Sequence, residues 1–220
     1  MQYKLVIFDL DGTLMDTREG VLSAVDYAVA KMGLNELSSP YREHFVGPPI
    51  EDSFMKSYNL SKCELRDVIQ IYRKRYNDYD LLKAVPYVGV CDLLELLKKY
   101  NMKIAVATYK KHSDAIPLLE HFKFSNYYDV AYGADPDNKL KKSDIIKKCI
   151  KDLEVSPNET VMIGDTKLDA IGAEQIGCDF IGVTYGFGFK SKDDVYKYKN
   201  VGAADTIKEL CEMLLPNTIH

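Results

Sequence analysis

The sequence feature that most constrains the fold is an alternation of short apolar runs with amphipathic stretches. The runs are rich in residues that favour strands and lie at residues 5–8, 103–107, 128–132, 161–163 and 180–183. Runs of this kind are typical of strands that are buried on both faces of a parallel sheet. Between them, apolar residues recur at helical intervals within residues 90–97, 145–150, 171–176 and 207–214. The alternation predicts an α/β fold, a doubly wound (Rossmann-like) parallel sheet.

One stretch interrupts this alternation. Residues 15–82 contain no convincing strand, but they carry a helical apolar pattern that ends at Gly33 and a second helix signal at residues 61–64. That second signal, Ser-Lys-Cys-Glu, is a capping box that opens a helix running to about Tyr79. We therefore expect a core domain at residues 1–14 and 83–220, with a small α-helical domain inserted at residues 15–82.

Charge and composition exclude several classes of partner. The 220 residues carry a net charge of −4, which gives no general attraction to nucleic acid or to an anionic membrane. No window reaches the roughly 18 apolar residues of a membrane span, and the N-terminal apolar run is too short for a signal peptide. The five cysteines are widely spaced and form no CxxC pair, which is typical of a reducing compartment. We expect a cytoplasmic protein with neither membrane nor nucleic acid as partner.

Two acidic residues directly follow the first apolar run. Ligands of an open parallel sheet bind beyond the carboxyl ends of its strands, so Asp9 and Asp11 would lie at the ligand edge. In an extended backbone, side chains two residues apart point the same way. Two such charges at about 4 to 5 Å repel by roughly 1 to 4 kcal/mol. A hard divalent cation would offset that repulsion.

The other predicted strand ends carry complementary groups. Thr108 follows the second run, Lys142 begins the helix after the third, and Asp165 and Asp169 follow the fourth at a spacing of one helical turn. Taken singly, each group has an ordinary explanation as a turn residue, a solvated lysine or a helix cap. Taken together, they supply a nucleophile, an acid, a hydroxyl, an ammonium and a metal site, which suffices for phosphoryl transfer through an aspartyl phosphate.

These residues also match the motifs of a known family. The sequence resembles the haloacid dehalogenase superfamily of phosphohydrolases, with its DxDGT motif at residues 9–13, its strand-end Thr or Ser at Thr108 and its GDxxxD motif at residues 164–169. The resemblance covers nearly the whole chain. Residues 47–49, 87–89, 181–186 and 202–205 look like the phosphoglycolate phosphatase-like branch, in which the helical insert is a cap domain.

The resemblance implies a role for each motif residue. Asp9 would attack phosphorus, and Asp11 would protonate the leaving oxygen and then activate water. Mg²⁺ would be held by Asp9, the backbone carbonyl of Asp11 and Asp165. Asp169 and Gly164 would support these ligands without binding the ion directly. Thr108 and the lysine of the third motif would bind the phosphoryl oxygens.

The sequence departs from the family pattern at two motifs. The second motif often continues as Ser-Asn or Ser-Lys-Pro, whereas Tyr109, Lys110 and Lys111 follow Thr108 here. The third motif often reads Lys-Pro-x-Pro, a string that is absent. Lys142 fits an alternative form of that motif and is our choice, with Lys139 and Lys141 as the other candidates.

Four residues of the insert are candidates for substrate contacts: Arg42, His44, Gly47 and Pro48. The Gly186-Phe187-Gly188 segment lacks the third glycine of a dinucleotide-binding loop, and we interpret it as a flexible turn.

We therefore predict a magnesium-dependent phosphatase that hydrolyses a small phosphomonoester, such as a phosphoglycolate-like compound, a nucleotide or a sugar phosphate. The alternatives are a β-phosphoglucomutase-like phosphosugar mutase, a pyrophosphatase and, more remotely, a non-catalytic receiver-like phospho-acceptor. In a receiver the acceptor acid follows a middle strand, which argues against the last of these. Whether the protein is a monomer or a homodimer stays open at this point.

Overall fold

The computed structural model describes residues 3–137 and 139–216. It divides into two compact units, one formed by Met1–Met15 with Pro86–His220 and the other by Asp16–Val85. The strand β2 (Met15–Asp16) pairs with β3 (Val85–Pro86) at the two points where the chain passes from one unit to the other.

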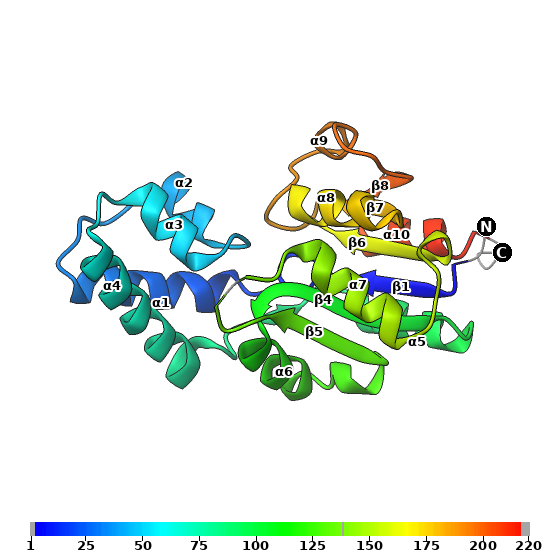
Figure 1. Ribbon diagram of the computed structural model, residues 1–220, viewed down its shortest axis with the longest axis horizontal. Helices are drawn as coiled ribbons and strands as arrows, with labels where there is room; N and C mark the ends of the chain where they lie inside the picture. The colour runs from blue at the N-terminus through cyan, green and yellow to red at the C-terminus, as the bar shows by residue number, and fades with distance from the viewer. Residues whose placement is uncertain (1–2, 138, 217–220) are drawn as a thin grey trace. The chain divides into compact units, whose positions relative to one another are not determined.

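The larger unit contains a six-stranded sheet in which every neighbouring pair is parallel. Its spatial order is β5 (Val130–Ala134), β4 (Lys103–Lys111), β1 (Leu5–Phe8), β6 (Thr160–Gly164), β7 (Asp179–Val183) and β8 (Gly202–Ala204). The first strand in sequence therefore lies inside the sheet, with later strands on both sides of it (Figure 1). This arrangement confirms the predicted α/β fold class.

The connections between the strands are helical. They comprise α5 (Val90–Lys99), α6 (His112–His121), α7 (Lys142–Asp152), α8 (Lys167–Ile176), the short α9 (Lys192–Val195) and, after the last strand, α10 (Ile207–Leu214). The helices α5, α7, α8 and α10 confirm the predicted periodic segments. The sequence did not predict α6 or β8, and β5 begins two residues later than expected.

The core of this unit explains why β1 is apolar throughout. All four of its residues are buried, and Leu5 and Ile7 share one hydrophobic cluster with Ile145 and Ile146 of α7. The register aligns Phe8 with Val106 on β4 and with Ile163 on β6. Because these strands are parallel and in step, the residues that follow β1, β4 and β6 emerge at one edge of the sheet.

The second unit is predominantly helical. It contains α1 (Arg18–Lys31), α2 (Ser39–Arg42), α3 (Ile50–Ser57) and α4 (Lys62–Arg75), with a 3₁₀ turn at Glu43–Phe45 and a π-helical turn at Tyr76–Asp80. The predicted capping box is present, since Ser61 and Glu64 each bond the other's backbone amide. Phe54 is fully buried and packs edge-on against Phe45 at a centroid distance of 4.8 Å.

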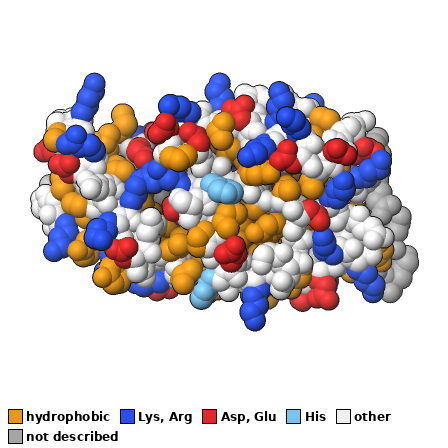
Figure 2. Space-filling model, turned by 60° about the horizontal axis from the view of Figure 1, so that its bottom comes forward, with side chains coloured by type: hydrophobic (Ala, Val, Ile, Leu, Met, Phe, Trp, Pro, Cys, Tyr) orange, Lys and Arg blue, Asp and Glu red, His pale blue; other side chains and the backbone are white. Residues whose placement is uncertain are grey.

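The surface carries charges of both signs. Figure 2 shows one face, on which basic and acidic side chains are interspersed, in keeping with the small net charge of −4. Every helix in residues 3–137 and 139–216 is too short or too polar to cross a membrane.

Candidate active site

Three buried carboxylates converge at the carboxyl edge of the sheet. One oxygen from each of Asp9, Asp165 and Asp169 lies within 4.8 Å of the others. Asp9 directly follows β1, Asp165 directly follows β6, and Asp169 lies in the first turn of α8. The backbone amide of Asp9 donates to the carbonyl of Ile163 at 2.9 Å, which extends the pairing of the two strands into the site. The parallel register thus brings together residues that lie 156 positions apart in the sequence.

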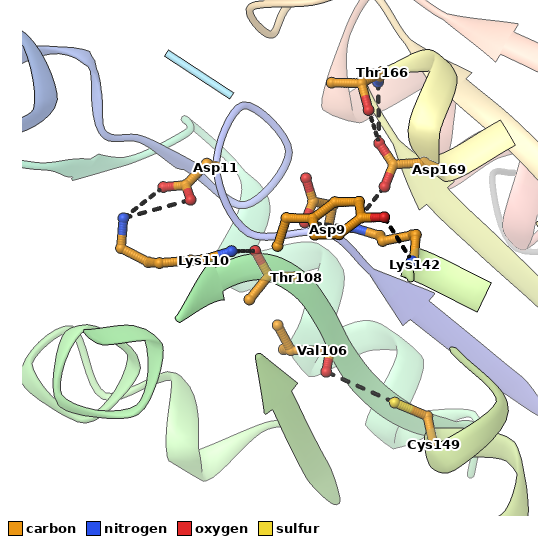
Figure 3. A network of polar contacts seen from close by, with 10 residues as sticks. Asp9, Asp11, Val106, Thr108, Lys110, Lys142, Cys149, Thr166 and Asp169 are labelled. Atoms are coloured by element: carbon orange, nitrogen blue, oxygen red, sulfur yellow. Dashed lines mark hydrogen bonds and ion pairs between the residues drawn. The ribbon is translucent and has the colours of Figure 1, made fainter. Parts of the chain in front are cut away.

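A single ammonium group lies among these acids. Lys142 Nζ is 2.8 Å from Asp9 Oδ1 and 2.6 Å from Asp169 Oδ1, and its side chain is only 3% exposed (Figure 3). The alternative lysines of the third motif, Lys139 and Lys141, are both exposed. Lys142 is therefore the lysine of the three that the fold brings into the cluster. When all four groups are ionised, three carboxylates and one ammonium leave two net negative charges.

This excess of negative charge changes the ionisation of the acids. Burial raises the pKa of Asp9 to about 7 against the opposing attraction of Lys142, and the charge of Asp169 adds to the rise. Burial likewise raises the pKa of Asp165 to about 8, helped by the charges of Asp9 and Asp169. Burial lowers the pKa of Lys142, but the two carboxylates beside it outweigh that effect and raise it. The carboxylates therefore lack enough positive charge from the protein itself.

The donor set suits a hard divalent cation. Asp165 Oδ2 accepts hydrogen bonds from the backbone amides of Phe187, at 2.7 Å, and Gly188, at 3.0 Å. Its other oxygen, Oδ1, is buried and has no hydrogen-bond partner among the described residues. A buried oxygen without a partner is costly unless something else satisfies it. Oxygen-only ligands beside an uncompensated charge are what Mg²⁺ requires, so the residues present fit such an ion.

Two glycines allow the acid cluster to close. A Cβ at Gly164 would lie 2.3 Å from the Asp169 carboxyl carbon, and one at Gly186 would lie 2.2 Å from the carbonyl oxygen of Gly12. Gly164 therefore supports the site by leaving space for Asp169. Sequence reasoning interpreted residues 186–188 as a flexible turn and missed that their amides hold Asp165. No motif in the sequence signals this contact, because it is made by the backbone.

Asp11 lies outside this carboxylate cluster. Its two oxygens are 3.2 and 3.4 Å from Lys110 Nζ (Figure 3). The chain does not stay extended after Asp9, since the amides of Leu14 and Met15 both bond the carbonyl of Leu10. The charge of Asp11 nevertheless contributes to the rise in the pKa of Asp9, so the two carboxylates interact. The expectation that their side chains point the same way assumed an extended backbone and stays a prediction.

Thr108 and Tyr109 lie at the end of β4. Thr108 is 1% exposed, and its hydroxyl oxygen accepts the backbone N–H of Lys110 at 3.1 Å, so that its own O–H remains a donor. The hydroxyl oxygen of Tyr109 accepts the backbone N–H of Lys142 at 2.8 Å, which fixes the start of α7. Sequence reasoning noted Tyr109 and Lys110 only as departures from the motif.

Comparison with known proteins identifies the family. The sequence pattern described as haloacid dehalogenase-like hydrolase matches residues 6–183. The chain belongs to this family. It is 33% identical over 196 residues to a 5′-nucleotidase of Pseudomonas aeruginosa, a match that covers 89% of this chain and 88% of the relative. It is 32% identical to the tyrosine-protein kinase PtkA of Mycobacterium tuberculosis, covering 96% of this chain and 72% of PtkA.

Solved structures support the same family assignment. The crystal structure of a predicted phosphatase from Clostridium acetobutylicum is 34% identical and superposes with a TM-score of 0.89, covering 98% of this chain and 100% of that one. The predicted family and the predicted enzyme class, a hydrolase of the phosphatase type, are therefore confirmed.

In this haloacid dehalogenase-like hydrolase, the four candidate substrate residues of the insert lie within the helical unit. Arg42 donates from Nε to Asp26 Oδ1 at 2.7 Å and from Nη2 to the other oxygen, so its guanidinium is already paired. Arg42 also lines a hollow of about 560 Å³ in this unit. The carbonyl of His44 accepts the hydroxyl of Ser53. Gly47 has a φ of +103°, which L side chains rarely adopt, and Pro48 follows it.

Proposed function

We propose that this chain is a magnesium-dependent phosphatase that hydrolyses a small phosphomonoester through an aspartyl phosphate on Asp9. The observation that carries the proposal is the convergence of Asp9, Asp165 and Asp169 around Lys142, with Asp165 Oδ1 buried and without a partner among the described residues. This geometry supports a carboxylate nucleophile beside a cation site, and membership of a hydrolase family supports the same chemistry.

Asp9 is the proposed nucleophile. Its carboxylate is held at one oxygen by Lys142, which favours the ionised, nucleophilic form. Asp9, the main-chain carbonyl of Asp11 and Asp165 would hold Mg²⁺, which when bound neutralises charge on the phosphoryl group. The Thr108 hydroxyl and the Lys142 ammonium would donate to the phosphoryl oxygens, where negative charge develops.

Asp11 is the proposed carrier of the proton. As the bond from Asp9 to phosphorus forms and the ester P–O bond breaks, the Asp11 carboxyl would give its proton to the leaving oxygen. In the second half of the reaction, Asp11 would take a proton from the water that attacks phosphorus, and the bond from phosphorus to Asp9 would break. One carboxyl group thus acts first as acid and then as base, which leaves the enzyme unchanged.

We infer that residues 16–85 act as a cap that selects the substrate, with Arg42, His44, Gly47 and Pro48 as candidate contacts. The similarity to a 5′-nucleotidase makes nucleoside monophosphates the first substrates to test. Phosphoglycolate and sugar phosphates complete the panel, since the chemical site recognises only the phosphoryl group that all of them share.

The test is the release of inorganic phosphate from this panel, measured with MgCl₂ and with EDTA. We expect turnover of at least one ester with Mg²⁺ and none with EDTA. Asp9→Asn should lower kcat by about 10⁴-fold or more, as for the loss of other covalent nucleophiles. The matched control is Asp193→Asn, which changes an exposed aspartate of the same unit and should leave kcat unaltered. Full activity of Asp9→Asn would refute the proposed nucleophile.

A further inference from the structure

The contact between Lys110 and Asp11 has no part in the function proposed above. Lys110 follows Thr108 by two residues on β4, and Asp11 follows Asp9 by two residues after β1. The ammonium of Lys110 is 3.2 Å from one oxygen of Asp11 and 3.4 Å from the other. The Lys110 side chain is 7% exposed and that of Asp11 15%. This pair is therefore more enclosed than the surface ion pairs that contribute little to stability.

A register irregularity in the sheet lies beside Lys110. The pairing of β4 with β5 shifts register between Ala107 and Lys111. Bulges of this kind re-aim side chains and are frequent beside active sites. Without the shift, strict alternation would place Thr108 and Lys110 on the same face as one another and leave Tyr109 opposite. Here Lys110 contacts Asp11, and the Thr108 hydroxyl accepts the backbone N–H of Lys110 (Figure 3). The hydroxyl of Tyr109 accepts the backbone N–H of Lys142 at the same edge.

The Asp11 side chain needs such a restraint. The backbone around it is fixed, because Gly12 N–H bonds the carbonyl of Met15 at 2.8 Å and Gly12 adopts a φ of +83°. A carboxyl group still rotates about two bonds, and a proton donor must be held close to the productive geometry to be effective. Contacts to both oxygens from one ammonium restrict both rotations.

We propose that Lys110 is the positioning residue that holds the Asp11 carboxyl for proton transfer. This inference rests on the proposed function, in which Asp11 gives a proton to the leaving oxygen. It predicts a specific defect. A poor leaving group, such as the alkoxide of glycerol 2-phosphate, requires protonation as the P–O bond breaks, whereas the stable anion of p-nitrophenyl phosphate does not. Loss of Lys110 should therefore impair hydrolysis of the alkyl ester selectively.

The experiment compares kcat/KM for these two esters, with MgCl₂ present. This ratio covers the steps up to formation of the aspartyl phosphate and leaves out its later hydrolysis. We expect Lys110→Met to lower kcat/KM for glycerol 2-phosphate by about 10- to 100-fold, the range of a misplaced reacting group. The value for p-nitrophenyl phosphate should change less than about 3-fold, because general acid catalysis contributes little there. Lys110→Arg, which keeps the positive charge, should recover most of the lost activity.

Controls separate this inference from the function on which it depends. Lys111→Met alters the next lysine, whose ammonium bonds the carbonyl of Pro136 instead, and should affect neither ester. Asp11→Asn should show the same leaving-group selectivity as Lys110→Met, and adding Lys110→Met to it should cause no further loss. If Lys110→Met does not fold, as judged by circular dichroism, Lys110→Gln takes its place.

Each outcome decides between the two claims. If Lys110→Met lowers kcat/KM equally for both esters, or for neither, the positioning role is overturned. A selective defect in Asp11→Asn alone overturns it as well but leaves the proposed function intact. The absence of selectivity in Asp11→Asn refutes Asp11 as the proton donor, and the inference about Lys110 falls with it.

Discussion

Each unit of this hydrolase buries carboxylates, and the two units differ in how the charge of these groups is balanced. In the α/β unit, Asp9, Asp165 and Asp169 share the ammonium of Lys142. In the helical unit, Asp80 alone is held by several donors. The first group has more negative charge than the protein compensates, and the second has more positive charge than it needs.

The Asp80 group is satisfied at every oxygen. Its Oδ2 is 2.7 Å from Arg75 Nε, and its Oδ1 is 2.7 Å from Lys83 Nζ and 3.0 Å from the Ser23 hydroxyl. Burial alone would raise the pKa of Asp80, but the hydrogen bonds from Arg75, Lys83 and Ser23 lower it. In the α/β unit the pKa values of Asp9 and Asp165 move the other way, to about 7 and about 8.

We interpret Asp80 as a structural buried acid and the acid cluster as the proposed functional one. A protein that buries a carboxylate for stability also buries its partners, as at Asp80. An acid cluster that stays short of cations reduces stability, and such clusters occur where a ligand supplies the missing charge. The following predictions test this distinction, from the largest expected effect to the smallest.

Replacing Lys142 should impair catalysis most strongly among the supporting residues. Lys142→Met removes the one ammonium of the cluster and a donor to the phosphoryl group, so we expect kcat to fall by about 10² to 10³-fold. Lys83→Met removes a cation from Asp80 instead and serves as the comparison. Steady-state kinetics on the best ester of the panel measures both. Similar losses in the two variants would show that the two groups do not differ in function.

Asp165→Asn should lower activity by weakening the binding of Mg²⁺. It removes the charge of a proposed direct ligand. Mutation of even an outer-shell partner of a metal site lowers metal affinity or activity by about 10- to 100-fold, so we expect activity to fall by about 10²-fold. Raising MgCl₂ should recover part of this loss, which a titration of rate against Mg²⁺ concentration would measure. Asp80→Asn, assayed at a temperature at which it is folded, should keep the Mg²⁺ dependence of the unmodified protein. An unchanged Mg²⁺ dependence in Asp165→Asn would contradict the proposed site.

The same two substitutions should change stability in opposite directions. With EDTA at pH 8, Asp165→Asn relieves repulsion between like charges, which amounts to about 1 to 4 kcal/mol at these distances. Asp80→Asn leaves buried donors without their acceptor charge and should lower the free energy of unfolding by about 1 to 3 kcal/mol. Urea denaturation followed by circular dichroism measures both. A lower stability for both variants would mean that the acid cluster is a structural group like Asp80.

The contribution of Asp80 should also disappear in acid. Because the pKa of Asp80 is lowered by folding, the folded state binds its proton less readily than the unfolded chain does. The stabilisation by Asp80 is therefore complete when the pH is above the pKa of Asp80 in the unfolded chain, about 3.9. It decreases as the pH falls through the lower pKa of Asp80 in the folded state. The difference in unfolding free energy between the unmodified protein and Asp80→Asn should be constant from pH 5 to 7 and shrink below about pH 4. A difference that does not depend on pH would rule out the ion pairs as its source.

Sequence reasoning predicted the parts of the fold that depend on local pattern. The buried strands and most helices of the α/β unit follow from apolar periodicity, and Asp9, Thr108, Lys142, Asp165 and Asp169 were placed at one edge by the parallel topology. β8 was missed because Gly202–Ala204 has little strand propensity, and pairing with β7 holds it in place. α6 was missed because Pro117 interrupts its pattern.

The contacts that sequence reasoning could not predict depend on the exact path of the backbone. The ion pair between Lys110 and Asp11 joins residues 99 positions apart, and the pairing of β4 with β5 shifts register beside Lys110. Neither feature follows from residue types or their spacing, because each depends on how distant segments of the chain pack together. The ends of strands are therefore the places where a motif identifies the residues but not their contacts.

The hydrogen bonds that hold Asp165 come from the backbone of the loop after β7, and this sets which changes the loop tolerates. Any residue at position 187 except proline can supply the same amide donor. The ring of Phe187 also lies beside Gly12, where an added Cβ would come within 2.9 Å of it. Position 188 is different, because a Cβ there would lie 2.3 Å from the carbonyl oxygen of Asp165. Neighbouring positions of one short loop thus face different demands, and a library of variants across it would exclude proline at position 187 and return only glycine at position 188.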